Sequence, residues 1–136
     1  MNRSLAKELK AAGFPIRSFR LGQKFYPNET HAQWSEASHR SGIFITHYEL
    51  QNNAREIEAG YYCPNLADLI EACGERFAHL SVEAALWTAV AANPPTIAMG
   101  HSAEEAVAKL WLTLASGHDN RSRTEFSGGR LSADAR

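Results

Sequence analysis

The stretch from Gly100 to Ala115 constrains the fold most, because it carries a helix start, an apolar stripe and a stop. Ser102 is a suitable N-cap, and Glu105 three residues later completes a capping box. Apolar side chains then recur at the spacing of one helix face, at Val107, Leu110, Trp111 and Leu114. We predict a helix over 102–115 that supplies one face of the core and ends before Gly117.

Two other segments also carry signals for the start and the end of a helix. Residues 4–12 place Leu5 and Leu9 four apart, and Gly13 follows where a helix would end. In the second segment, Asn65 is a suitable N-cap, with Asp68 as its capping-box partner, and Gly74 follows an apolar stripe. These signals predict helices over 4–12 and 65–73.

The strand signals are weaker because they rest on alternation and composition. Residues 43–50 have the strongest β-forming pattern, and the turn at 51–53 with alternation over 55–62 predicts a hairpin. Further strands are predicted at 17–26, 77–81, 82–92 and 96–99. The alanines of 82–92 also suit a helix, and the strand is favoured because Asn93-Pro94-Pro95 then connects it to 96–99. Residues 27–42 are predicted to form a loop held to the body by Trp34.

Together these elements predict an α+β fold in a chain of 136 residues, which is the size of one domain. One small antiparallel sheet packs against two main amphipathic helices, at 65–73 and 102–115, with a short N-terminal helix beside them. The predicted domain covers 3–116. Residues 117–136 have few bulky apolar side chains and are predicted to form a disordered tail.

Charge is unevenly distributed along the chain, although the formal net charge is only -1. Residues 1–24 contain six basic side chains against Glu8, whereas 25–80 contain eight acidic side chains against three arginines. One interpretation is that the two regions face each other in the fold. The other is that the basic start docks on an acidic partner or on nucleic-acid phosphates.

Aromatic and basic side chains interleave over 14–26, as they do in surfaces that stack bases and contact phosphates. A nucleic-acid site would use Arg17, Arg20, Lys24 and Phe19. The same composition is typical of an amphipathic strand whose apolar face lies in the core, and the sequence favours this second interpretation.

No pattern points to a catalytic residue, a metal site or a cofactor. The set Cys63, Cys73, His79 and His101 lacks the short paired spacing of zinc ligands. A nucleophile pair of Cys63 with His47 or His79 has no motif around it. Glu104 and Glu105 are explained by helix capping, and Cys73 by its place on an apolar stripe.

The chain is expected to be cytoplasmic and reduced. No apolar run approaches the roughly 20 residues of a membrane helix. The N-terminus lacks the apolar core of a secretory signal, and two cysteines ten positions apart do not indicate a disulfide scaffold.

Three segments that carry the predicted helices, 5–15, 64–74 and 102–114, occur in an order that resembles a group of small uncharacterised proteins of bacteriophages and prophages. Those proteins share the patterns LxxxLKxAGFP, LxxLIEACG and TPEEAVAxLWLAL. The resemblance implies a phage or prophage origin and a fold with strands before the last helix, but no activity. Residues 96–110 also resemble part of the HicB-type antitoxins, which usually continue into a DNA-binding module that this chain does not match after Gly117.

We therefore expect a non-catalytic phage-type or prophage-type accessory protein that acts by protein–protein contact with a partner or as a homodimer. The alternatives are a nucleic-acid-associated protein that uses 14–26 and a HicB-like antitoxin module.

Overall fold

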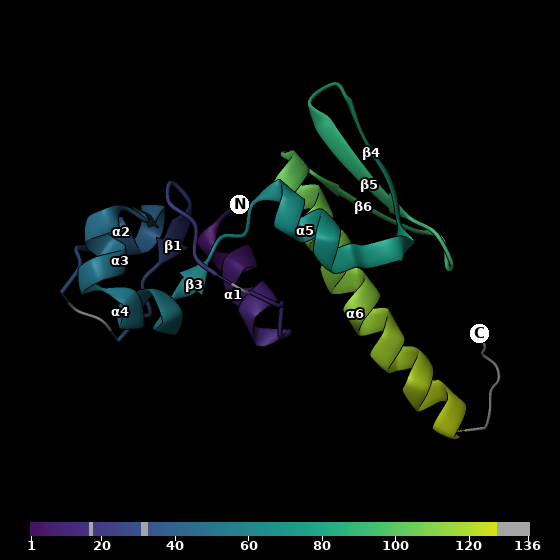
Figure 1. Cartoon of the computed structure of the whole chain (residues 1–136). Helices are drawn as coiled ribbons and strands as arrows, with labels where there is room; N and C mark the ends of the chain where they lie inside the picture. Colours follow the sequence, from purple (N-terminus) through teal and green to yellow (C-terminus); the bar gives the residue numbers. More distant parts are fainter. Residues whose placement is uncertain (17, 31–32, 128–136) are drawn as a thin grey trace.

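The computed structural model describes residues 1–16, 18–30 and 33–127, the last ten of them as backbone only, and it confirms an α+β fold (Figure 1). In place of the single sheet expected from the sequence, the described residues form two three-stranded antiparallel sheets. One sheet is built from strands within 24–62 and the other from strands within 77–100.

The second half of the chain folds as a helix, a three-stranded meander and a long helix. Its elements are α5 (Leu66–Cys73), the short 3-10 helix η1 (Gly74–Arg76), β4 (Phe77–Glu83), β5 (Leu86–Ala91), β6 (Thr96–Gly100) and α6 (Ala103–Ser127). The strands pair in the order β4-β5-β6, and the helices cover one face of this sheet (Figure 1). The core between them gathers apolar side chains, including Leu69, Cys73, Ala89, Ala91, Val107, Leu110 and Leu114.

The first half surrounds a much smaller sheet. Its elements are α1 (Arg3–Ala11), β1 (Lys24–Tyr26), α2 (Glu36–Ser41), β2 (Ile43–Phe44), α3 (His47–Asn52), α4 (Ala54–Ala59) and β3 (Tyr61–Tyr62). β1 lies between β2 and β3 and is antiparallel to both. A buried cluster of Phe25, Ile45, Ile57 and Tyr62 holds this half together. Figure 1 shows the short helices α2, α3 and α4 on the opposite side of α1 from the β4-β5-β6 sheet.

The helix α1 joins the two halves. Leu5 and Leu9 belong to the cluster that α5, α6 and the larger sheet form. Ala6, on the same helix, packs in a different cluster with Tyr26, Tyr61 and Cys63. The amphipathic pattern predicted over 4–12 is therefore confirmed, and its apolar face is shared between two cores.

The hairpin predicted over 43–62 is wrong. Only Ile43–Phe44 and Tyr61–Tyr62 are strands there; both pair with β1 and not with each other. The intervening residues form α3 and α4. Thr46 caps α3, its Oγ1 accepting from the amide of Glu49 at 3.2 Å. The apolar side chains of 43–50 also suit a strand, so composition alone misassigned them.

Two neighbouring predictions need smaller corrections. The strand expected over 17–26 is limited to Lys24–Tyr26 among the described residues, and the loop expected over 27–42 contains the helix α2. Ser35 caps α2, since its side chain accepts from the amide of Ser38. Trp34 does hold this segment to the body, because its ring packs edge-on against Phe25 with centroids 5.6 Å apart.

The capping signals of the two main helices are confirmed. Asn65 Oδ1 accepts from the amide of Asp68 at 2.8 Å, and Ser102 Oγ accepts from the amide of Glu105 at 3.1 Å. The carboxylate of Asp68 was expected to complete the first capping box, but it pairs instead with Arg20. Gly74 follows α5 with a φ of 68°, a conformation that glycine adopts at little cost.

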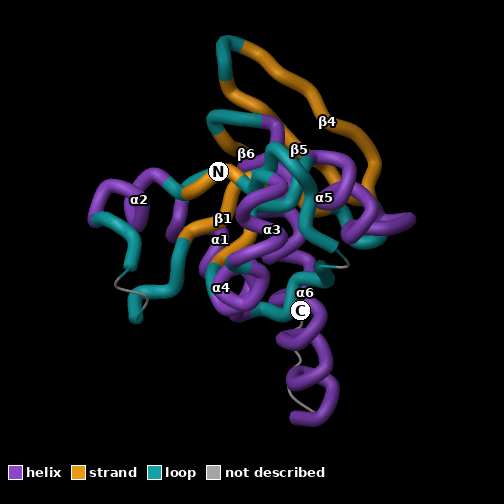
Figure 2. The backbone as a smooth tube through the Cα atoms, turned by 60° about the vertical axis from the view of Figure 1, so that its left-hand side comes forward, coloured by secondary structure: helices purple, strands orange, loops and turns teal. Residues whose placement is uncertain are grey.

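The helix α6 extends beyond its predicted end. Its backbone stays helical through Gly117 to Ser127, past the helix end predicted before Gly117, and 128–136 lie outside the described residues. A glycine inside a helix costs about 1 kcal/mol relative to alanine but leaves the hydrogen-bond ladder intact. No proline interrupts residues 118–127. Figures 1 and 2 show this part of α6 projecting from the rest of the fold.

The strands predicted over 77–81, 82–92 and 96–99 are present with shifted boundaries. β4 and β5 form a hairpin whose last pair is Glu83 with Leu86. Its two turn residues, Ala84 and Ala85, both have positive φ, at 53° and 65°. None of the helices in the described part of the chain is long and apolar enough to cross a membrane.

Candidate functional site

The residues of the alternative nucleic-acid site are engaged with other parts of the chain wherever the structure describes them. Arg20 forms an ion pair with Asp68 at 3.2 Å, and the Phe19 ring packs edge-on against Tyr62. The Lys24 ammonium lies 5.2 Å from the centre of the Tyr26 ring. Arg17 lies outside the described residues. Phe19, Arg20 and Lys24 therefore each contact a ring or a carboxylate of the chain itself.

The basic N-terminal region faces acidic residues from the middle of the chain, as one interpretation of the charge pattern predicted. Glu29 accepts from Lys7 Nζ at 2.8 Å and lies 2.6 Å from Arg3 Nη2. The Tyr61 hydroxyl donates to the other carboxylate oxygen of Glu29 at 2.7 Å. The hydrogen bond from Lys7, followed by those from Tyr61 and Arg3, holds the pKa of Glu29 well below its ordinary value.

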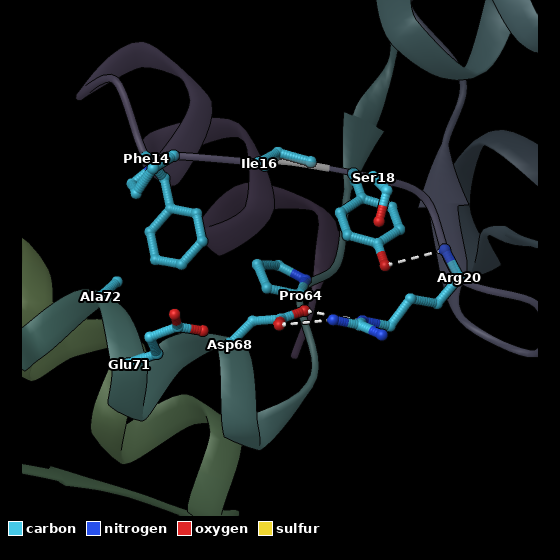
Figure 3. Close-up of a pocket in the computed structure, with 10 residues that line it drawn as sticks. Phe14, Ile16, Ser18, Arg20, Pro64, Asp68, Glu71 and Ala72 are labelled. Atoms are coloured by element: carbon cyan, nitrogen blue, oxygen red, sulfur yellow. Dashed lines mark hydrogen bonds and ion pairs between the residues drawn. The ribbon is translucent and has the colours of Figure 1, made fainter.

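A groove of about 290 Å³ lies between residues 14–20 and α5 (Figure 3). Phe14 and Pro64 give it apolar walls, while Asp68 and Glu71 project from α5 toward it. The Arg20–Asp68 pair crosses one end. This volume is at the lower limit of small-molecule sites, so the groove suits a small polar group or one side chain of a partner. Its described lining contains no imidazole or thiol.

The two cysteines are buried in different clusters. Cys63 packs with Ala6 and Tyr26, whereas Cys73 lies in the core beneath the larger sheet, as predicted from its apolar stripe. Burial raises the pKa of each thiol to about 11, which disfavours the reactive thiolate. Among residues that the structure describes, no three His, Cys, Asp or Glu side chains gather as metal ligands would.

The glutamate pair at the start of α6 has a structural role in capping. Glu105 accepts from the backbone amide of His101 at 2.9 Å and from Lys109 Nζ at 2.9 Å. The bond from Lys109, then that from His101, lowers the pKa of Glu105. The sequence predicted a capping box with Ser102, whereas the carboxylate accepts from the amide of the preceding residue, His101.

The outer face of the larger sheet carries a second candidate site. Residues directly opposite each other in antiparallel strands share a face, so the register separates two sides of the sheet. The inner side holds buried Ala89 and Ala91, which pack in the core with α6. The outer face carries His79, Ser81 and Glu83 from β4, Leu86, Thr88 and Val90 from β5, and Ile97 and Met99 from β6.

Polarity changes across this outer face. On β4 it presents His79, Ser81 and Glu83, all exposed and polar. On β6 it presents Ile97, which is 61% exposed, and Met99, which is 51% exposed. The sequence analysis predicted these strands but not this face, because a shift of one residue in register exchanges the two sides of a strand.

Neither a protein-family model, a curated protein nor a solved structure matches this chain.

Proposed function

We propose that this chain is a non-catalytic accessory protein of the phage or prophage type that acts by protein–protein contact through the outer face of the β4-β5-β6 sheet. The observation that carries the proposal is the exposure of Ile97 and Met99 beside Leu86 on one regular surface. Exposed apolar area favours association, since its removal from water contributes roughly 25 cal/mol per Å².

The outer face is backed by packed side chains and a helix, so it can act as a rigid binding surface. Ala89 and Ala106 are fully buried beneath it, and α6 packs along β5 and β6. A partner that docks there would not need to order the sheet first, which lowers the entropic cost of association. The buried free thiols fit a reducing compartment, so we place this function in the cytoplasm.

The experiment compares three proteins: wild type, the double variant Ile97→Lys/Met99→Lys, and the control Phe44→Lys. Phe44 is 65% exposed and lies on β2 of the other sheet, so the control places one new lysine on exposed apolar area outside the β4-β5-β6 sheet. Each protein is cross-linked in host cells, and its self-associated and hetero-associated species are quantified. Thermal unfolding followed by circular dichroism verifies that all three fold.

An associated species retained by wild type and Phe44→Lys but lost from the double variant supports the proposal. If no species depends on the outer face, the proposal is wrong. A labelled RNA or DNA probe tests the nucleic-acid alternative on the same proteins. Binding that falls steeply with salt and is lost in Lys24→Ala would assign the function to the 14–26 segment instead.

A further inference from the structure

The strand β6 is an open edge of the larger sheet. It pairs with β5 on one side over five consecutive residues, from Thr96 to Gly100, and no described strand pairs with its other side. An open edge presents backbone donors and acceptors in a row and is a template for another strand.

The two edges of this sheet differ in how they are protected. β4 has a register shift between Phe77 and His79 and a charged Glu83, and both features discourage pairing with another chain. β6 has no charged side chain, no proline and no bulge within its five residues. Its exposed side chains, Ile97 and Met99, are apolar. The sheet is thus protected at β4 and open to strand addition at β6.

We infer that the partner of the outer face is a second copy of this chain, whose β6 pairs antiparallel with β6 about a twofold axis at Ala98. The inference rests on the proposed function and specifies its partner. In this register Ile97 of each copy lies opposite Met99 of the other, and Thr96 lies opposite Gly100. The four exposed apolar side chains then form one row across a six-stranded sheet.

Charge favours a second copy at this place. A contact between identical chains brings like charges together wherever the surface is charged, and this costs association energy. Neither β6 nor the adjacent β5 contains a charged residue. Glu105, whose side chain approaches Gly100 at the end of β6, is paired with Lys109 at 2.9 Å.

The available area predicts a weak dimer. With 61% and 51% of their surfaces exposed, Ile97 and Met99 offer on the order of 100 Å² each, and the strand edge adds backbone. Stable dimers bury roughly 800 Å² on each partner, so β6 pairing belongs to the small, transient class of interfaces. We expect dissociation in the micromolar range or weaker and assembly that depends on concentration.

The test uses charge complementation, because it reports the register and not only the surface. Ile97→Lys and Met99→Glu are prepared separately and together in a 1:1 mixture, with Phe44→Lys as the control. Sedimentation equilibrium from about 10 μM to 1 mM brackets the weak affinities expected for small interfaces. We expect wild type and Phe44→Lys to dimerise with increasing concentration and each single β6 variant to remain monomeric.

In the mixture, the new lysine of one chain faces the new glutamate of the other, while the second Ile97–Met99 contact stays native. We therefore expect the mixture to regain a 1:1 dimer that weakens as salt increases. Failure of the mixture to dimerise, or dimers of both single variants, would overturn the β6 register. A wild type that stays monomeric throughout would overturn the second copy as partner.

These failures are distinguishable from failure of the proposed function. Wild type could be monomeric while cross-linking captures a different protein, and that capture could be lost in the Ile97→Lys/Met99→Lys variant. In that case the proposed function stands and the second copy as partner is wrong. If neither kind of association depends on Ile97 and Met99, both are wrong. Because these two side chains are exposed, we expect the variants to keep the wild-type circular dichroism spectrum.

Discussion

Arg20 binds the carboxylate of Asp68 through two nitrogen atoms, with Nε 3.3 Å from Oδ2 and Nη2 3.2 Å from Oδ1. The two residues are 48 positions apart, so the pair joins the segment after α1 to the first turn of α5. The backbone amide of Arg20 also donates to the Tyr62 hydroxyl at 3.2 Å. One arginine thereby fixes a segment that has no regular secondary structure of its own.

We predict a measurable coupling between Arg20 and Asp68 in a double-mutant cycle. Urea denaturation of Arg20→Ala, Asp68→Ala and the double variant gives the coupling free energy. Because the pair is solvent-exposed, the coupling should be small and should decrease from 0.1 M to 1 M salt as the Debye length falls from about 10 Å to about 3 Å. A coupling that is insensitive to salt would contradict this account.

Glu29 should make the free energy of unfolding decrease at acidic pH. Its pKa is lowered in the fold, so its contribution is present above the ordinary value of 4.5 and is lost as pH falls below it. The side chain is 46% exposed, and solvent screening therefore limits the contribution to about 1 kcal/mol. We expect Glu29→Gln to lower the free energy of unfolding at pH 7, with a difference from wild type that shrinks between pH 5 and pH 3. A constant difference across this range would be inconsistent with the ion-pair cluster.

The thiols of Cys63 and Cys73 should react slowly in the folded protein. With pKa values raised to about 11 from an ordinary 9, the thiolate fraction near pH 8 falls about 100-fold. Alkylation by iodoacetamide, followed by mass spectrometry, should therefore be at least that much slower in native protein than in urea. Rapid labelling of either cysteine under native conditions would show that its cluster opens.

Substitutions in the β4–β5 turn should increase the stability of the fold. Ala84 and Ala85 both adopt left-handed backbone conformations, which cost an alanine roughly 1–2 kcal/mol. The favoured pair in such two-residue turns is Asn-Gly. We expect Ala84→Asn/Ala85→Gly to raise the free energy of unfolding by about 1 kcal/mol or more. The control Ala98→Gly, at a regularly paired position of β6, should lower it instead, by about 1 kcal/mol.

Two glycines should respond to alanine in opposite directions. A Cβ on Gly100 would lie 2.7 Å from the amide nitrogen of Ala106 and 2.9 Å from Glu105 Cβ, so Gly100→Ala should cost about 1–3 kcal/mol. A Cβ on Gly117 would meet nothing within 4 Å, and alanine is the better helix former by about 1 kcal/mol. Thermal denaturation should thus show a lower midpoint for the first variant and a higher one for Gly117→Ala. Equal effects would contradict the close approach of β6 to α6.

The elements that could be predicted from the sequence are those specified by local chemistry. Asn65 and Gly74 mark the ends of α5 through hydrogen bonds and backbone angles that involve only nearby residues. The pairing of β1 with β3 joins Phe25 to Tyr62 across the chain, and no local signal encodes it. The helix α3 did carry a usable signal, since Thr46 and Glu49 have the spacing of a capping box, but the β-forming side chains around them outweighed it in the prediction.

At the candidate site, too, the strands could be predicted from local sequence, whereas the face that they expose could not. Strands over 82–92 and 96–99 could be predicted from β-forming side chains and the Asn93-Pro94-Pro95 connection between them. Which side of each strand meets water depends on the face that α6 covers, and no local signal encodes that packing. For this reason Ile97 and Met99 could be placed in a strand but not on the outer face before the structure was known.

The position of α1 has a consequence for how the chain loses its structure. Leu5 and Leu9 pack in one core while Ala6 packs in another, so a helix of nine residues links two hydrophobic clusters. We expect the cooperativity of unfolding to depend on the first dozen residues together with contacts such as Arg20–Asp68. Anything that detaches them, whether a protease or a poorly placed affinity tag, would turn one sharp unfolding transition into two broad ones.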